Sequence, residues 1–140
     1  FNDRLWVMGG ATGRRNDPPE KGYEDVTTLN DVWCSDDGAT WTQVLEEAPW
    51  APRMWTVAAV YRGCMWLIAG YDNRNHRNFG DVWYTSDGVH WREFVAGKVF
   101  GPRHEVSPFV FNDSLWVVAG NEWPVQNDVW RLTLPKDWQP

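Results

Sequence analysis

Residues 65–91 read MWLIAGYDNRNHRNFGDVWYTSDGVHW, and this stretch decides the fold because its landmarks recur along the chain. A short apolar segment ending in glycine is followed by an Asp-Val-Trp triplet, and a second tryptophan comes eight residues after the triplet. The apolar segment recurs as LWVMGG at 5–10 and as LWVVAG at 115–120. The triplet recurs at 31–33 and 128–130, each time with a tryptophan eight residues later. Self-similarity at a period of about 50 residues indicates a repeat architecture.

Each repeat is expected to contain four short strands, A to D in chain order, and no helix is expected. Strand A opens with an arginine after a proline, strand B is apolar throughout as a strand buried on both faces is, and strand C carries the triplet. Asp-Gly at 37–38 and 87–88 indicates a tight hairpin turn from C to D. The predicted ranges are 53–61 and 103–111 for A, 5–9, 65–69 and 115–119 for B, 30–35, 80–85 and 127–133 for C, and 41–45 and 91–95 for D.

Loop length varies at one end of these strands only. The tryptophans of strands B and C are 27, 17 and 14 residues apart in the three repeats, whereas those of C and D are always 8 apart. The variation falls in the predicted B–C loops, Gly10 to Asn30, Gly70 to Gly80 and Gly120 to Asn127. In an up-and-down sheet the D–A connections emerge at the same end. Function is expected there, because variable loops on a rigid scaffold commonly carry binding sites.

Charge and composition exclude some partners. The chain of 140 residues has 13 basic and 19 acidic side chains and a net charge of −6. Nucleic acid and an anionic membrane surface are disfavoured because both attract clustered Lys and Arg. No apolar run approaches the roughly 18 residues that span a bilayer. Nine of the twelve tryptophans hold repeat positions, so Trp50, Trp55 and Trp123 remain as candidates for ligand binding.

The set of landmarks, including Pro-Arg at 52–53 and 102–103, resembles the kelch repeat, which builds β-propellers of the galactose-oxidase type. Two repeats depart mildly, with Ala-Gly at 69–70 and 119–120 in place of Gly-Gly. The C–D hairpins also resemble the Asp-box of sialidase-type propellers, a motif that is usually structural. The resemblance implies an all-β propeller of four-stranded antiparallel blades in a single segment 1–140, with blade 1 partial at 1–47, blade 2 at 48–97 and blade 3 at 98–140.

The count of blades predicts association. Propellers close with roughly four to eight blades, and this chain supplies just under three. Open strand edges and an uncovered face favour self-association. Two interpretations stay open: the chain is a fragment of a longer propeller, or copies assemble, for instance two arcs into a six-bladed ring.

Arg53 and Arg103 are candidate ligand-binding residues at the loop-bearing end. A guanidinium offers paired donors to an anion or a sugar carboxylate. The alternative is structural, with each arginine tying neighbouring blades together through backbone carbonyls or an aspartate of the next repeat. His104 and Glu105 follow Arg103, and a Glu beside a His can serve in acid–base catalysis. Trp50, Trp55 and Trp123 can stack on a sugar ring or a partner side chain, or can simply pack within their loops.

Neither a metal nor a cofactor is expected. The three histidines, His76, His90 and His104, occupy different places in the repeat. The copper chemistry of galactose oxidase requires a Cys–Tyr crosslink near the axis, and Cys34 and Cys64 do not suit that role. A disulfide between these two cysteines stays open. The recurring Asp31, Asp81 and Asp128 are interpreted as structural.

The sequence therefore predicts a binding or scaffold module that presents a loop-lined face to a protein or carbohydrate ligand. An alternative from another class is a sugar-active enzyme similar to the kelch-type mutarotases and epimerases of sialic acid, with Arg53, Arg103 and Glu105 as site residues. A purely structural role in an assembly is the third possibility.

Overall fold

The computed structural model describes residues 1–13 and 26–140, and within them the protein is all-β, without a helix. Ten strands form three antiparallel sheets, and none of these sheets closes on itself. Sheet 1 contains β1 (Leu5–Thr12), β2 (Thr27–Ser35) and β3 (Thr42–Leu45). Sheet 2 contains β4 (Val57–Tyr61), β5 (Cys64–Asp72), β6 (Arg77–Thr85) and β7 (Arg92–Glu93). Sheet 3 contains β8 (Ser107–Phe111), β9 (Ser114–Gly120) and β10 (Gln126–Leu132).

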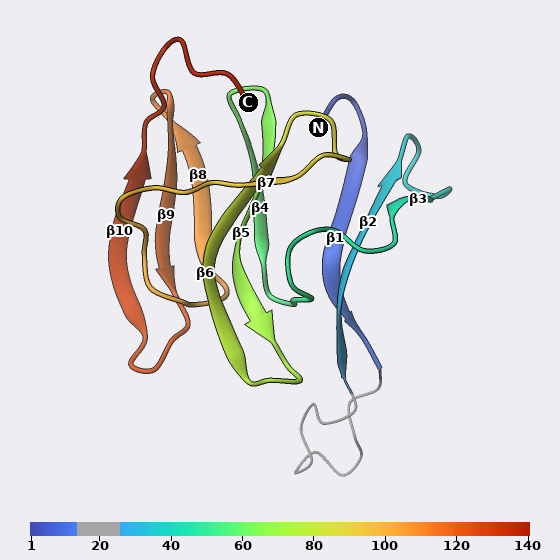
Figure 1. Cartoon of the computed structure of the whole chain (residues 1–140), viewed down its shortest axis with the longest axis horizontal. Coiled ribbons are helices and arrows are strands. Elements are labelled where there is room, and N and C mark those ends of the chain that lie inside the picture. The colour runs from blue at the N-terminus through green and yellow to red at the C-terminus, as the bar shows by residue number, and fades with distance from the viewer. Residues whose placement is uncertain (14–25) are drawn as a thin grey trace.

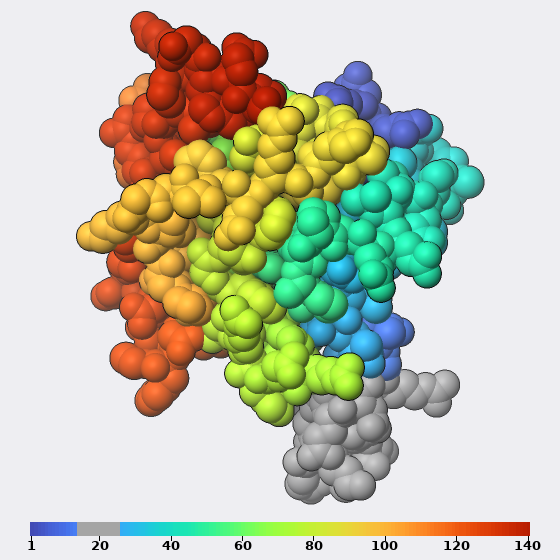
Figure 2. All heavy atoms as spheres, in the orientation of Figure 1, coloured from blue at the N-terminus to red at the C-terminus, as the bar shows by residue number. Residues whose placement is uncertain are grey.

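The three sheets stand side by side with sheet 2 in the middle (Figure 1). The hairpins β5–β6 and β9–β10 turn at the lower end of that view, and both chain termini lie at the upper end. The segment after β7 leaves sheet 2 and crosses the front of sheet 3, as the space-filling view also shows (Figure 2). No helix that could cross a membrane occurs in the described part of the chain.

β5 holds the sheets together because both of its faces are buried. Met65 and Leu67 contribute to an apolar cluster with Val32, Trp50 and Trp91, between sheets 1 and 2. The alternate residues of β5 contribute to a second cluster between sheets 2 and 3. Side chains of a strand point alternately to opposite faces, so one continuous apolar run serves two interfaces. From the facing strands, the second cluster includes Trp66 and Ile68 on β5 and Leu115 and Val117 on β9.

A bulge near the glycine that ends each apolar segment shortens the predicted B–C loops. The pairing register shifts at Gly9 and at Ala69, which have φ of 59° and 58°, and Ala119 has the same φ of 58°. After the shift the strands continue to pair, with Thr12 opposite Thr27 and Asp72 opposite Arg77 in the first two sheets. Much of what was predicted as loop is therefore strand. Residues 14–25 of the first loop lie outside the described residues.

The predicted strand A begins later than expected. Residues 53–56 and 103–106 are connections that cross between sheets, and regular pairing begins at Val57 and Ser107. The cause is a left-handed residue in each connection, Trp55 and Glu105, both with φ of 53°. A residue in this conformation interrupts an extended strand.

The Asp-Gly hairpins adopt one hydrogen-bonded turn in both places. The Ser35 hydroxyl accepts from the Gly38 amide at 2.8 Å, and the Asp37 carboxylate accepts from the Ala39 and Thr40 amides at 2.8 and 2.7 Å. These amides, that of Thr40 foremost, lower the pKa of Asp37 to about 2. Thr85 and Asp87 repeat the arrangement. The turn is thus a self-contained unit that needs no ligand.

The turn at Gly88 packs against sheet 1, and this predicts a sharp response to a single methyl group. Gly88 has φ of +83°, and a Cβ there would overlap the indole ring of Trp6. We expect Gly88→Ala to lower the free energy of unfolding by about 3 kcal/mol, because clash adds to backbone strain. Gly38→Ala is the matched control, since its φ of +75° is similar but its nearest neighbour is the flexible end of Leu5 at 3.2 Å. Urea denaturation should show a loss of about 1 kcal/mol for the control. Equal losses would contradict this packing.

Candidate functional site

Arg53 makes a buried, two-pronged ion pair with Asp81. Its side chain is fully buried, and its Nη1 and Nη2 atoms donate to the two carboxylate oxygens at 2.6 and 2.8 Å. Nη1 also donates to the Ala69 carbonyl at 3.1 Å and Nε to the Ala51 carbonyl at 3.0 Å. Burial alone would raise the pKa of Asp81, but the Arg53 guanidinium and the Trp83 N–H outweigh it and hold the pKa below its ordinary value.

Arg103 repeats this arrangement in sheet 3. Its guanidinium binds both oxygens of Asp128, with Nη2 and Oδ2 3.1 Å apart, and also donates to the Ala119 and Gly101 carbonyls at 3.1 Å. The hydrogen bond from Arg103 is the main reason that the pKa of Asp128 is lowered. The Asp128 side chain is 39% exposed against 23% for Asp81, so water screens the second pair more.

The backbone of each arginine hydrogen-bonds to the preceding sheet, while its side chain binds an aspartate of its own sheet. The Arg53 amide donates to the Leu29 carbonyl at 2.9 Å, and its carbonyl accepts from the Gly10 amide at 2.8 Å. Arg103 makes the same two bonds to Phe79 and Gly70, both at 3.0 Å. Each arginine therefore links two sheets. This geometry favours the structural alternative for Arg53 and Arg103, because their donors are bound within the protein.

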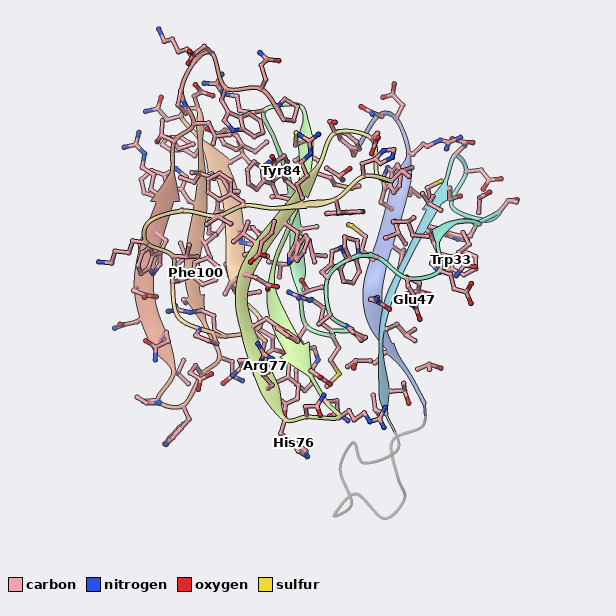
Figure 3. All side chains as sticks on the ribbon, in the orientation of Figure 1. Trp33, Glu47, His76, Arg77, Tyr84 and Phe100 are labelled. Atoms are coloured by element: carbon pink, nitrogen blue, oxygen red, sulfur yellow. The ribbon has the colours of Figure 1, made fainter. Side chains whose placement is uncertain are left out.

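Aromatic rings cover both guanidinium groups. The Arg53 guanidinium carbon lies 4.1 Å from the Phe79 ring centroid and 5.9 Å from that of Trp50. Phe100, three residues ahead of Arg103 as Trp50 is ahead of Arg53, lies 5.5 Å from the Arg103 guanidinium. Phe100 is labelled in Figure 3, on the segment that crosses to sheet 3. Trp50 is buried and packs edge-on against Trp91. It is therefore part of the core, which corrects the expectation of a surface residue available to a ligand.

The burial of the Arg53–Asp81 pair predicts how much stability is lost when the arginine is removed. Arg53→Met leaves a mostly buried carboxylate without its partner, so the free energy of unfolding should fall by about 3 kcal/mol or more. Arg103→Met should lower the free energy of unfolding by less, because the more exposed carboxylate of Asp128 can be rehydrated. Asp31→Asn is a control at the equivalent position of sheet 1, where no ion pair occurs within the described residues, and it should change stability by about 0.5 kcal/mol or less. In urea denaturation, adding Asp81→Asn to Arg53→Met should recover part of the loss; strictly additive losses would contradict a direct pair.

An open hollow of about 940 Å³ lies beside this scaffold, at the loop-bearing end. Its walls are residues 26–28 of sheet 1, Pro52, Trp55, His104 and residues 71–76 around the β5–β6 turn. His76, labelled in Figure 3, projects from the tip of that turn. The hollow lies between segments of sheets 1 and 2, and the connecting segments add Trp55 and His104 to its wall.

Three rings form a cluster in the wall of the hollow, and each of them contacts the other two. The ring centroid of Trp55 is 5.5 Å from that of Tyr71 and 4.9 Å from that of His104, with interplanar angles of 26° and 25°. Tyr71 and His104 also meet, with centroids 5.3 Å apart. The Trp55 ring remains 37% exposed. The Tyr71 hydroxyl and His76 Nδ1 are 3.1 Å apart. An indole that is held in place by two neighbouring rings and is still partly exposed suits stacking on a ligand ring.

His104 also belongs to a polar cluster. Its Nδ1 is 2.6 Å from the Asn78 amide oxygen, and the Asn78 nitrogen donates to Glu122. Its Nε2 is 3.7 Å from a Glu105 carboxylate oxygen, which also accepts from the Asn121 side chain at 3.4 Å. Burial lowers the pKa of His104, while Glu105 and Glu122 act in the opposite direction. The imidazole is therefore neutral at pH 7.

Asp72 organises the far wall of the hollow. Its carboxylate accepts from the amides of Arg74 and Asn75, from the Asn75 side chain at 2.6 Å and from the Thr28 hydroxyl at 3.4 Å. Burial raises the pKa of Asp72, but these donors together lower it below its ordinary value. The carboxylate thus fixes the β5–β6 turn against sheet 1 and stays charged.

The other candidates lie elsewhere. Trp123 is exposed in the β9–β10 loop and does not line the hollow. Cys34 and Cys64 are buried free thiols, and burial raises the pKa of Cys64. No cluster of three His, Cys, Asp or Glu that could hold a metal occurs in 1–13 and 26–140.

Sequence reasoning singled out Trp55 and His104, but it missed Tyr71, Asp72 and Asn75. These residues follow the bulge in a segment that was assigned to a loop. A β-bulge directs the residues after it to new neighbours, and the only signal in the sequence was the Ala-Gly pair at 69–70.

Compared with known proteins, the sequence matches no protein-family model and no curated protein.

Proposed function

We propose that the three sheets are neighbouring blades of a kelch-type β-propeller and that this propeller is a binding module with its ligand site in the hollow at Trp55. Two observations support the propeller. An arginine links each pair of neighbouring sheets, and within every sheet the strands that pair are consecutive in the chain. The partly exposed indole of Trp55, which packs against Tyr71 and His104, is the observation that carries the site.

A carbohydrate is the ligand class that the hollow suits best. The flat face of an indole packs against the C–H groups of a sugar ring, and the sugar hydroxyls need nearby polar groups. Asn73, Asn75 and the Asp72 carboxylate line the same hollow and supply donors and acceptors. A protein loop is the alternative ligand. It would place an aromatic or aliphatic side chain on the same indole.

Trp55→Ala tests this site. In saturation-transfer NMR with a panel of neutral and acidic sugars, a ligand of the natural protein should bind Trp55→Ala roughly tenfold more weakly, because the stacking surface is lost. Trp41→Ala is the matched control, since Trp41 is also 37% exposed but does not line the hollow. Circular dichroism checks that both variants fold. The carbohydrate proposal fails if no sugar binds at millimolar concentration, or if the two variants weaken binding equally.

The sugar-active enzyme remains the alternative function. Glu105 beside His104 is the observation that favours it, although Arg53 and Arg103 are engaged with aspartates. The same NMR samples test it, since a mutarotase or epimerase would convert one sugar signal into another over time. Conversion that Glu105→Gln abolishes would support an enzyme, and unchanged spectra would leave binding alone.

We further propose that copies of the chain associate through the outer faces of sheets 1 and 3. Leu5 and Val7 are exposed on sheet 1, whereas Met65 and Leu67, at the same places in sheet 2, are buried against sheet 1. Phe109 and Phe111 are exposed on sheet 3. Stacking sheet 3 of one copy on sheet 1 of another repeats the contact already made between sheets within the chain, and it covers both apolar faces.

Light scattering tests this association. A two-copy ring should have a mass of about 33 kDa, twice that of the chain at 16.3 kDa. Val7→Lys should return the mass to that of one chain, because a lysine on the stacked face would lose its hydration. Val95→Lys is the control, since Val95 is 84% exposed and lies on neither face. A mass of one chain for the natural protein at high concentration would exclude the ring.

A further inference from the structure

The hydrogen bonds around His104 fix which of its ring nitrogens carries the proton. The side-chain nitrogen of Asn78 donates to the Glu122 carboxylate, so the Asn78 oxygen faces His104 and lies 2.6 Å from Nδ1. That oxygen can only accept, which makes Nδ1–H the donor. A neutral imidazole has a single N–H. The other nitrogen, Nε2, is therefore a hydrogen-bond acceptor.

Glu105 places a second acceptor beside this nitrogen. One of its carboxylate oxygens lies 3.7 Å from His104 Nε2, and neither atom has a proton to donate to the other. The Glu105 side chain is 54% exposed, and its backbone amide donates to the Trp55 carbonyl at 3.0 Å, so the pair lies next to the indole and can be reached from solvent. A single nitrogen about 2.8 Å from each acceptor fits between them and can donate to both.

The surroundings of the pair favour a positively charged donor. Carboxylates of Asp72, Glu105 and Glu122 lie in the wall of the hollow or in the polar cluster at His104. Among the described residues that line the hollow, Arg74 is the one lysine or arginine. The partly exposed Trp55 ring adds to the attraction, because the face of an indole is electron-rich and binds cations. An ammonium group supplies the charge and has three N–H bonds, whereas a hydroxyl has one proton and can satisfy only one acceptor.

We propose that the ligand of the hollow is an amino sugar, whose ring lies on Trp55 and whose ammonium group bridges His104 Nε2 and the Glu105 carboxylate. This inference rests on the sugar-binding function proposed above and names the chemistry of its ligand. The indole binds the ring of any sugar, while the acceptor pair selects the ammonium over a hydroxyl or an acetamide, which carry no charge. Asn78 and Glu122 are positioning residues, because they act through the His104 ring.

Three sugars that differ at one carbon test this selection. Glucosamine, N-acetylglucosamine and glucose carry an ammonium, an acetamide and a hydroxyl group there. In saturation-transfer NMR at pH 7, glucosamine should bind the natural protein about tenfold more tightly than the other two. Glu105→Gln should remove this advantage and leave glucose binding unchanged, because the amide lacks the charge. Glu93→Gln is the matched control, since Glu93 is exposed on β7 and does not line the hollow.

Nitrogen-15 NMR of the imidazole tests the acceptor itself and needs no ligand. The chain has three histidines, and His104→Gln identifies the signals of His104. At pH 7 the natural protein should show a proton on Nδ1 and none on Nε2, and glucosamine should shift the Nε2 signal more than glucose does. A proton on Nε2, in the other tautomer or in an imidazolium, would overturn the proposal, because His104 would then donate to Glu105 itself.

The outcomes separate the class of ligand from the existence of the site. Equal binding of the three sugars that Trp55→Ala weakens would overturn the amino-sugar proposal and leave the sugar site in place. An advantage of glucosamine that survives Glu105→Gln would overturn the acceptor pair. Binding of none of the sugars at millimolar concentration would overturn both this inference and the carbohydrate function of the hollow.

Discussion

The bond between a buried arginine and an aspartate of its own sheet is the constraint on which the arrangement of the sheets depends. Arg53 cannot occupy its position unless Asp81 neutralises it, since an unpaired buried charge is costly. Once the side chain is held, the Arg53 backbone is held too, and its amide and carbonyl bind Leu29 and Gly10 of the preceding sheet. One residue thereby fixes the distance between two sheets, and Arg103 repeats the device.

Most of the aromatic residues serve this arrangement. Trp50 and Phe100 lie over the guanidinium groups, and Trp66 packs in the interface of sheets 2 and 3. The indole N–H of Trp83 and that of Trp130 bind the same aspartates as the arginines do. The high tryptophan content therefore follows from the number of flat interfaces between sheets. Large rings fill such interfaces and still satisfy a polar group at their edge.

The hollow exists because the crossing segments and the bulges meet at one end of the sheets. The bulges carry Tyr71 and Asp72 past the end of the regular apolar segment, and the crossing segments bring Trp55 and His104 beside them. The residues that form the hollow thus come from two different parts of the repeat, the end of the bulged strand and the segment that connects one sheet to the next. The repeated arginines and aspartates support the scaffold, whereas Trp55 and His104, which differ from their counterparts in the other repeat, line the hollow.

The sequence by itself determined the order of strands, the hairpin turns and the apolar segments, because each depends on neighbours within a few residues. Alternation along a strand and Asp-Gly at a turn act locally, so the triplets and the hairpins at 37–38 and 87–88 were predictable. The sequence also indicated Arg53 and Arg103 as candidate site residues, because they recur in the repeat. It left open whether their guanidinium groups bind a ligand or other groups of the protein. Only the tertiary structure decided that, since the partners Asp81 and Asp128 lie 28 and 25 residues away in the chain. The same holds for Trp50, which the fold buries, and for Trp55, which it packs against Tyr71 and His104 and leaves partly exposed. Such contacts depend on how the sheets pack against one another, and no local pattern of residues specifies that packing.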